Sequence, residues 1–81
     1  MPRYQLYLHR QNLPRGPKDA DATGQIVNGA FRVTVNWGSV SPGSHYDFMQ
    51  GNNPQGRRQC ERIETRQIGK NKFKVVAANF A

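Results

Sequence analysis

The chain has 81 residues and a formal net charge of +7, from 12 Lys and Arg against 5 Asp and Glu. Leu, Ile, Val and Phe occupy only 16 of the 81 positions, so the composition predicts one small basic domain over 1–81 with a thin core. The single cysteine excludes an internal disulfide framework, and no apolar run approaches the ~18 residues that span a bilayer, so we expect a cytoplasmic protein that binds no membrane.

Strand-like alternation opens the chain over Arg3–Arg10. The apolar side chains of one face are Tyr4, Leu6 and Leu8. Tyr7 falls on the opposite, polar face, and this period of two predicts a half-buried strand. Residues 11–24 follow with two prolines and two glycines, which predict a loop.

The stretch "TGQIVNGAFRVTVNW", residues 23–37, predicts a β-hairpin. Asn28-Gly29 lies between two apolar runs and is typical of a type I′ turn, in which both central residues need φ > 0. That turn places Ile26 opposite Phe31. The face so formed collects Ile26, Phe31, Val33, Val35 and Trp37.

The middle of the chain is less regular. Ser41-Pro42 is a typical helix start and Asn52-Asn53-Pro54 a typical stop, so we expect one short helical segment here, with an irregular loop as the alternative. Residues 57–68 fit a helix or a strand. We favour a second hairpin with Ile68 opposite Phe73. Val75 and Val76 point to opposite sides, so either a bulge or burial of the last strand on both faces is expected, and the register stays open.

These elements predict a mostly β fold, or α+β if the helical segment forms. A five-stranded barrel-like sheet or a sheet of two hairpins would accommodate them. In outline the element order resembles the small barrels of the OB or SH3-like kind, although no family signature accompanies it.

Residue types for catalysis are present without a supporting pattern. Cys60, His45 and Asp47 are the types found in nucleophilic sets, but no sequence spacing brings them together. The chain has no CxxC or paired-His metal motif and no glycine-rich phosphate loop. We therefore expect a protein that is not an enzyme and that holds no metal or cofactor.

The strongest functional signal is the positive charge of the C-terminal third. Residues 57–81 carry seven basic and two acidic side chains, a field that attracts polyanions. The basic residues expected to contact phosphate are Arg57, Arg58, Arg62, Arg66, Lys70, Lys72 and Lys74. Glu61 and Glu64 favour the alternative of an ordinary solvated surface with cross-strand ion pairs.

Aromatic residues near these charges would add base stacking. Tyr7 is the preferred candidate because it falls on the polar face of its strand. Phe73 lies between Lys72 and Lys74 and is the second candidate, although a core position is the favoured interpretation for Phe73 and for Trp37.

The sequence thus predicts a non-catalytic protein that binds single-stranded DNA or RNA through a basic β-hairpin, because no recognition helix for a duplex groove is found. The alternative is a protein-interaction module, such as an accessory, inhibitor or assembly protein, whose basic face docks on an acidic protein partner. The thin core also predicts a homo-oligomer joined through an exposed strand edge or through the Phe80 end of the chain.

Overall fold

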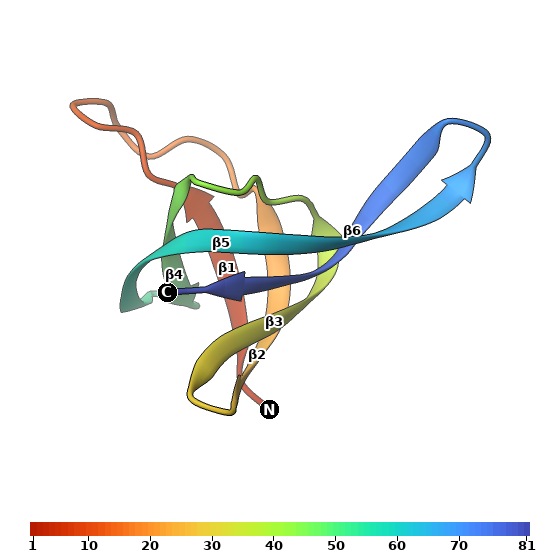
Figure 1. Cartoon of the computed structure of the whole chain (residues 1–81). Coiled ribbons are helices and arrows are strands. Elements are labelled where there is room, and N and C mark those ends of the chain that lie inside the picture. The colour runs from red at the N-terminus through yellow and green to blue at the C-terminus, as the bar shows by residue number, and fades with distance from the viewer.

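The computed structural model describes residues 1–81 as six antiparallel strands closed into a barrel (Figure 1). The strands are β1 (Arg3–Leu8), β2 (Ala20–Val27), β3 (Ala30–Gly38), β4 (His45–Gln50), β5 (Asn53–Gly69) and β6 (Lys72–Phe80). Around the barrel they follow the order β1-β2-β3-β6-β5-β4, and β4 pairs with β1 to close the ring. The mostly β prediction is confirmed, with six strands in place of five.

The predicted short helix is wrong, because a turn and a strand occupy its place. Pro42 and Gly43 lie at the centre of the turn, where Gly43 has φ 87°, and the Ser44 N–H donates to the Ser41 carbonyl at 3.4 Å. Proline followed by a glycine with φ > 0 suits a type II turn. In β4, Tyr46 and Phe48 then alternate into the interior.

The hairpin between β2 and β3 is confirmed. Asn28 has φ 51° and Gly29 has φ 80°, as a type I′ turn requires. Ile26 lies opposite Phe31, and Val27 lies opposite Ala30, as the turn predicts. β2 begins at Ala20, inside the segment expected to be a loop.

The apolar face predicted for this hairpin is buried only in part. Its buried members are Val33 and Val35. Ile26 is 64% exposed and Trp37 is 54% exposed. A bulge between Asp21 and Ala22 shifts the register, so Trp37 lies opposite Asp21, and the Lys18 ammonium stands 5.1 Å from the centre of the indole ring.

Aromatic rings organise the core. Phe48 lies at their centre, with its ring centroid 4.9 Å from that of Phe80 and 5.5 Å from those of Tyr4 and Phe31. Gly24 lets two of these rings approach β2, because a Cβ there would come within 2.8 Å of both Tyr4 and Phe31. The structure contains no helix of the length and apolar character that a bilayer span requires.

The choice between helix and strand over 57–68 is settled in favour of a strand, because β5 runs unbroken through this segment. The start of β5 pairs with β4, and the remainder forms a hairpin with β6. The predicted pairing of Ile68 with Phe73 is wrong by one residue. Gln67 lies opposite Phe73, because a bulge between Gln67 and Gly69 absorbs Ile68.

Candidate nucleic-acid interface

The far half of the β5–β6 hairpin leaves the barrel as a two-stranded arm, which we define as Arg66–Lys74. Its strand residues pair only with one another, and every one of its nine residues is exposed. Figure 1 shows the arm projecting away from the body of the barrel. A ribbon with no third strand and no buried face gains little stability from packing, so its residues are available for contacts with a partner.

The arm carries charge of one sign. Its cations are Arg66, Lys70, Lys72 and Lys74, and it contains no acid. None of these four takes part in an ion pair. The ion pairs of the structure join Lys18 to Asp21, Arg32 to Glu64 and Arg57 to Asp47. The arm is therefore an uncompensated positive surface.

The two faces of the arm differ in chemistry. Arg66 lies opposite Lys74, and strand alternation puts Lys72 on the same face. Gln67 lies opposite Phe73 on the other face, which carries no charge. Phe73 is 64% exposed, so its predicted core position is wrong. One face thus offers cations and the other an accessible aromatic ring.

A second polar group lies on the barrel, away from the arm and near the β2–β3 turn, where a row crosses β3, β6 and β5. Asn79 stands between Arg32 and Arg62 in this row. The three residues help to line a hollow of about 270 Å³. Glu64 accepts a hydrogen bond from Arg32, and this bond lowers the pKa of the exposed Glu64 carboxyl below its ordinary value. Arg62 is exposed and has no ion pair, but its charge also helps to lower the pKa of Glu64, so this cation stands apart from the uncompensated surface of the arm.

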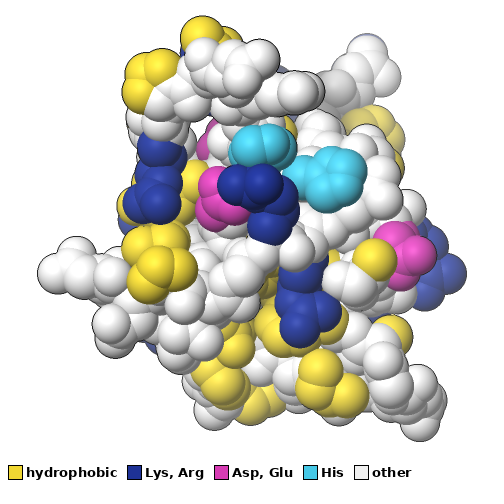
Figure 2. Space-filling view, turned by 90° about the vertical axis from the view of Figure 1, so that its left-hand side faces the viewer, with side chains coloured by type: hydrophobic (Ala, Val, Ile, Leu, Met, Phe, Trp, Pro, Cys, Tyr) yellow, Lys and Arg dark blue, Asp and Glu magenta, His cyan; other side chains and the backbone are white.

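Two of the predicted phosphate ligands are engaged elsewhere. Arg57 donates to Asp47 at 2.7 Å. The Arg58 guanidinium lies 4.5 Å from the centre of the Phe31 ring and donates to the Ala81 carbonyl at 3.1 Å. On the face turned away from the arm, basic side chains lie beside acidic and histidine side chains (Figure 2). Part of the positive charge at that end of the molecule is thus paired with acids, as in Lys18–Asp21 and Arg57–Asp47.

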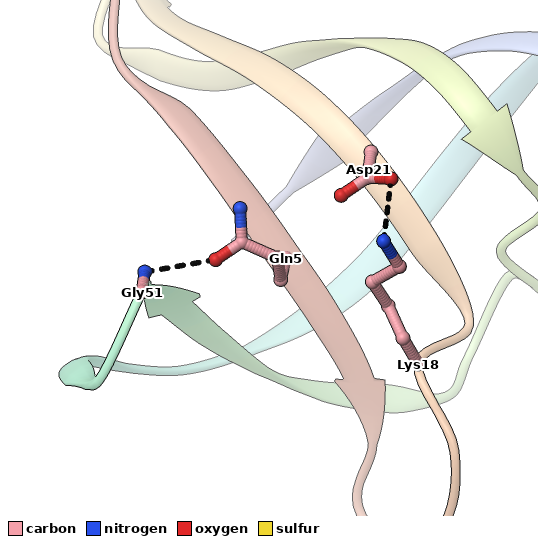
Figure 3. Close-up of polar contacts among 4 residues, drawn as sticks. All are labelled: Gln5, Lys18, Asp21 and Gly51. Atoms are coloured by element: carbon pink, nitrogen blue, oxygen red, sulfur yellow. Dashed lines mark hydrogen bonds and ion pairs between the residues drawn. The ribbon is translucent and has the colours of Figure 1, made fainter.

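Tyr7 also lies apart from the arm, on β1. It stands opposite Asp47 on β4, and the Arg15 guanidinium covers its half-buried ring at 4.9 Å from the centroid. Two polar contacts lie on this wall (Figure 3): the Gly51 N–H donates to the Gln5 side chain at 2.9 Å, and Lys18, which precedes β2, pairs with Asp21 near the start of that strand.

The predicted site residues therefore divide into separate groups. Those gathered on the arm are Arg66, Lys70, Lys72, Lys74 and Phe73. Those on the barrel are Arg57, Arg58, Arg62 and Tyr7. Gln67 was missed as a neighbour of Phe73. Gln67 lies opposite the Phe73 ring because of the bulge at Ile68, and no turn motif in the sequence predicts that bulge.

The residue types for nucleophilic chemistry are separated by the barrel wall. Cys60 faces the interior and is fully buried, and this burial raises the pKa of its thiol. His45 is exposed, and Asp47 is bound to Arg57 on the outside. This arrangement cannot activate the thiol through the imidazole.

Comparisons of the chain with protein-family models, with curated proteins and with solved structures give no match. The chemistry of the arm is therefore the main guide to function.

Proposed function

We propose that the protein binds nucleic acid without catalysing a reaction, and that the arm holds single-stranded DNA or RNA. The observation that carries this proposal is the grouping of four unpaired cations and an exposed aromatic ring on nine residues that pair only with one another. Cations on such a surface neutralise phosphates and release their counterions. An exposed ring stacks on bases, for about 1–3 kcal/mol per base.

Single strands suit this surface better than a duplex, because a base has to be unstacked before it can lie on Phe73. A two-stranded ribbon also fits the width of a major groove, so a duplex probe belongs in the test. An acidic protein surface would meet the cations equally well. However, it gives no role to the exposed Phe73 ring on the opposite face of the arm.

A second copy of the chain is a poor partner for the cationic face. Three of the five acids are already in ion pairs. A fourth, Asp19, accepts a hydrogen bond from the Leu8 N–H. Only Glu61 is left without a polar partner, so another copy offers no acidic patch.

The test is binding of labelled single-stranded DNA, single-stranded RNA and duplex DNA, followed by fluorescence anisotropy between 50 and about 200 mM salt. Affinity should fall linearly in log–log form as salt rises. Replacing Lys70 and Lys72 with Gln should reduce the slope by about 1.4, or 0.7 for each lost phosphate contact.

A matched control replaces Arg3 and Arg10 with Gln, which removes the same charge from exposed positions off the arm. This control should change the slope little. Equal effects of the two variants would refute the arm as the contact surface. Absence of binding to every nucleic acid at low salt, together with binding to poly-glutamate, would support the acidic protein partner instead.

A further inference from the structure

Two like charges face each other across the arm. Arg66 and Lys74 are directly paired in the β5–β6 register, so their side chains leave the ribbon on the same face. Residues in such a pair have Cβ atoms about 4.5–5.5 Å apart, and like charges at this spacing destabilise the sheet. Nothing else in the ribbon requires two cations at these positions, because neither packs in the core.

No acid of the chain relieves this repulsion. The nearest acid along β5 is Glu64, which Arg32 already binds. The residue opposite Lys72 is Gly69, and the Lys72 side chain lies over it, because a Cβ at Gly69 would come within 3.8 Å of the Lys72 Cβ and Cδ atoms. The arm therefore presents two adjacent cations, with a third cation, Lys72, beside them on the same face.

We propose that Arg66 and Lys74 jointly hold one phosphodiester group of the bound strand. This inference rests on the proposed function and identifies two residues that bind the same phosphate of the ligand. One anion between the two side chains turns their repulsion into two attractions. The Arg fork can take two of its oxygens while the Lys ammonium acts as a point charge. Lys72 stands two residues along β6 on the same face, about 7 Å away, where it can meet the next phosphate.

The salt dependence of oligonucleotide binding tests this sharing directly. The slope counts neutralised phosphates, at about 0.7 each for a single strand. If one phosphate is shared, Arg66→Gln or Lys74→Gln alone should leave the slope nearly unchanged, because the other cation still neutralises that phosphate. The double variant should lower the slope by about 0.7. Lys18→Gln, which removes a cation already paired with Asp21, is the control and should change nothing.

Separate contacts would instead lower the slope by about 0.7 for each single variant and about 1.4 for the double variant, which would overturn the shared phosphate. A double variant with an unchanged slope would overturn it as well. Failure of the wild type to bind any oligonucleotide would refute the proposed function itself, so the two failures are distinguishable.

The free protein supplies a second measurement. If Arg66 and Lys74 repel each other without ligand, either single variant should slow hydrogen exchange of the arm amides at low salt. Faster exchange in both single variants would mean that the two cations hold the ribbon together, and it would overturn the proposal.

Discussion

Replacing Phe73 with Ala separates a stacking role from a structural one. The side chain is 64% exposed and lies opposite Gln67, so its removal leaves no cavity. The free energy of unfolding should change by no more than about 0.5 kcal/mol, as for other surface positions. For a domain of this size, that is less than about 4 °C in Tm. Phe48, which is 1% exposed, is the contrast, because Phe48→Ala should cost about 3–5 kcal/mol.

Binding should respond in the opposite way. A ring that stacks on one base contributes about 1–3 kcal/mol, so Phe73→Ala should weaken oligonucleotide binding by about 5- to 150-fold. The log–log salt slope should stay the same, because loss of a neutral ring releases no counterions. Loss of stacking in Phe73→Ala should therefore lower the affinity alone, whereas loss of phosphate contacts in the lysine variants should lower the salt slope as well.

Anisotropy titrations at three or more salt concentrations would measure both quantities. Phe73→Trp should retain binding, and Phe73→Leu should lose it although the residue stays apolar. Tyr7→Ala should have the smaller effect of the two aromatic truncations, since Arg15 already covers the Tyr7 ring. Unchanged affinity for Phe73→Ala would refute stacking on the arm. A fall in its Tm comparable to that of Phe48→Ala would show that the ring is structural.

Other predictions follow from the barrel. Gly29→Val should lower the unfolding free energy by about 1–2 kcal/mol in urea denaturation, because a β-branched residue resists the left-handed region, whereas Gly29→Asn should be tolerated; equal midpoints for the two would contradict the turn assignment. Glu64 has a lowered pKa in the folded state, so its contribution to stability is complete above the ordinary value of 4.5 and is lost as the pH falls through the folded-state pKa. The Tm of Glu64→Gln, measured between pH 3 and about 6, should lack this part of the pH dependence of stability. Identical pH profiles for the variant and the wild type would show that the Arg32–Glu64 contact is not the source of that dependence. The buried Cys60 thiol, whose pKa is raised by desolvation, should react with iodoacetamide far more slowly in the native protein than in urea, and equal rates would contradict its burial. Self-association through the free strand edges of the arm should appear in sedimentation over a hundredfold concentration range and strengthen in the Arg66→Gln/Lys74→Gln variant, whereas a monomer throughout would refute it.

The elements that could be predicted are those whose signal is local. Asn28-Gly29 determines the turn type, and the turn determines the register, so the β2–β3 pairing follows from two residues. The inward alternation of β1 depends only on its own side chains, and fully buried Leu6 is its clearest member. In contrast, β4 is short, and the Ser41-Pro42 pair before it is typical of a helix start. In the structure Pro42 instead belongs to a type II turn, so the sequence pattern favours a helix where a strand forms.

Burial of the exposed aromatic residues could not be predicted, because it depends on where each strand leaves the barrel. Lys72-Phe73-Lys74 has the alternation of a strand with one apolar face, and that pattern usually means a core position. In the structure the barrel ends at Val75, the last residue of this stretch to pack inside, and the ring two positions beyond it has no sheet to cover it. Val75 and Phe73 therefore lie on the same face of β6, but one is buried and the other exposed. The difference arises because β5 and β6 extend beyond the neighbouring strands, which the sequence pattern does not show.

This extension beyond the barrel is also what makes the arm the candidate site. A hairpin built only for stability would end at the barrel rim, where Val75 and Ala78 still gain burial. Residues 66–74 add two unpaired strand edges, a like-charge pair and an exposed ring, each of which opposes folding or solubility. Under the proposed function, a single strand that passes around the ribbon would neutralise the facing cations on one face and cover the Phe73 ring on the other.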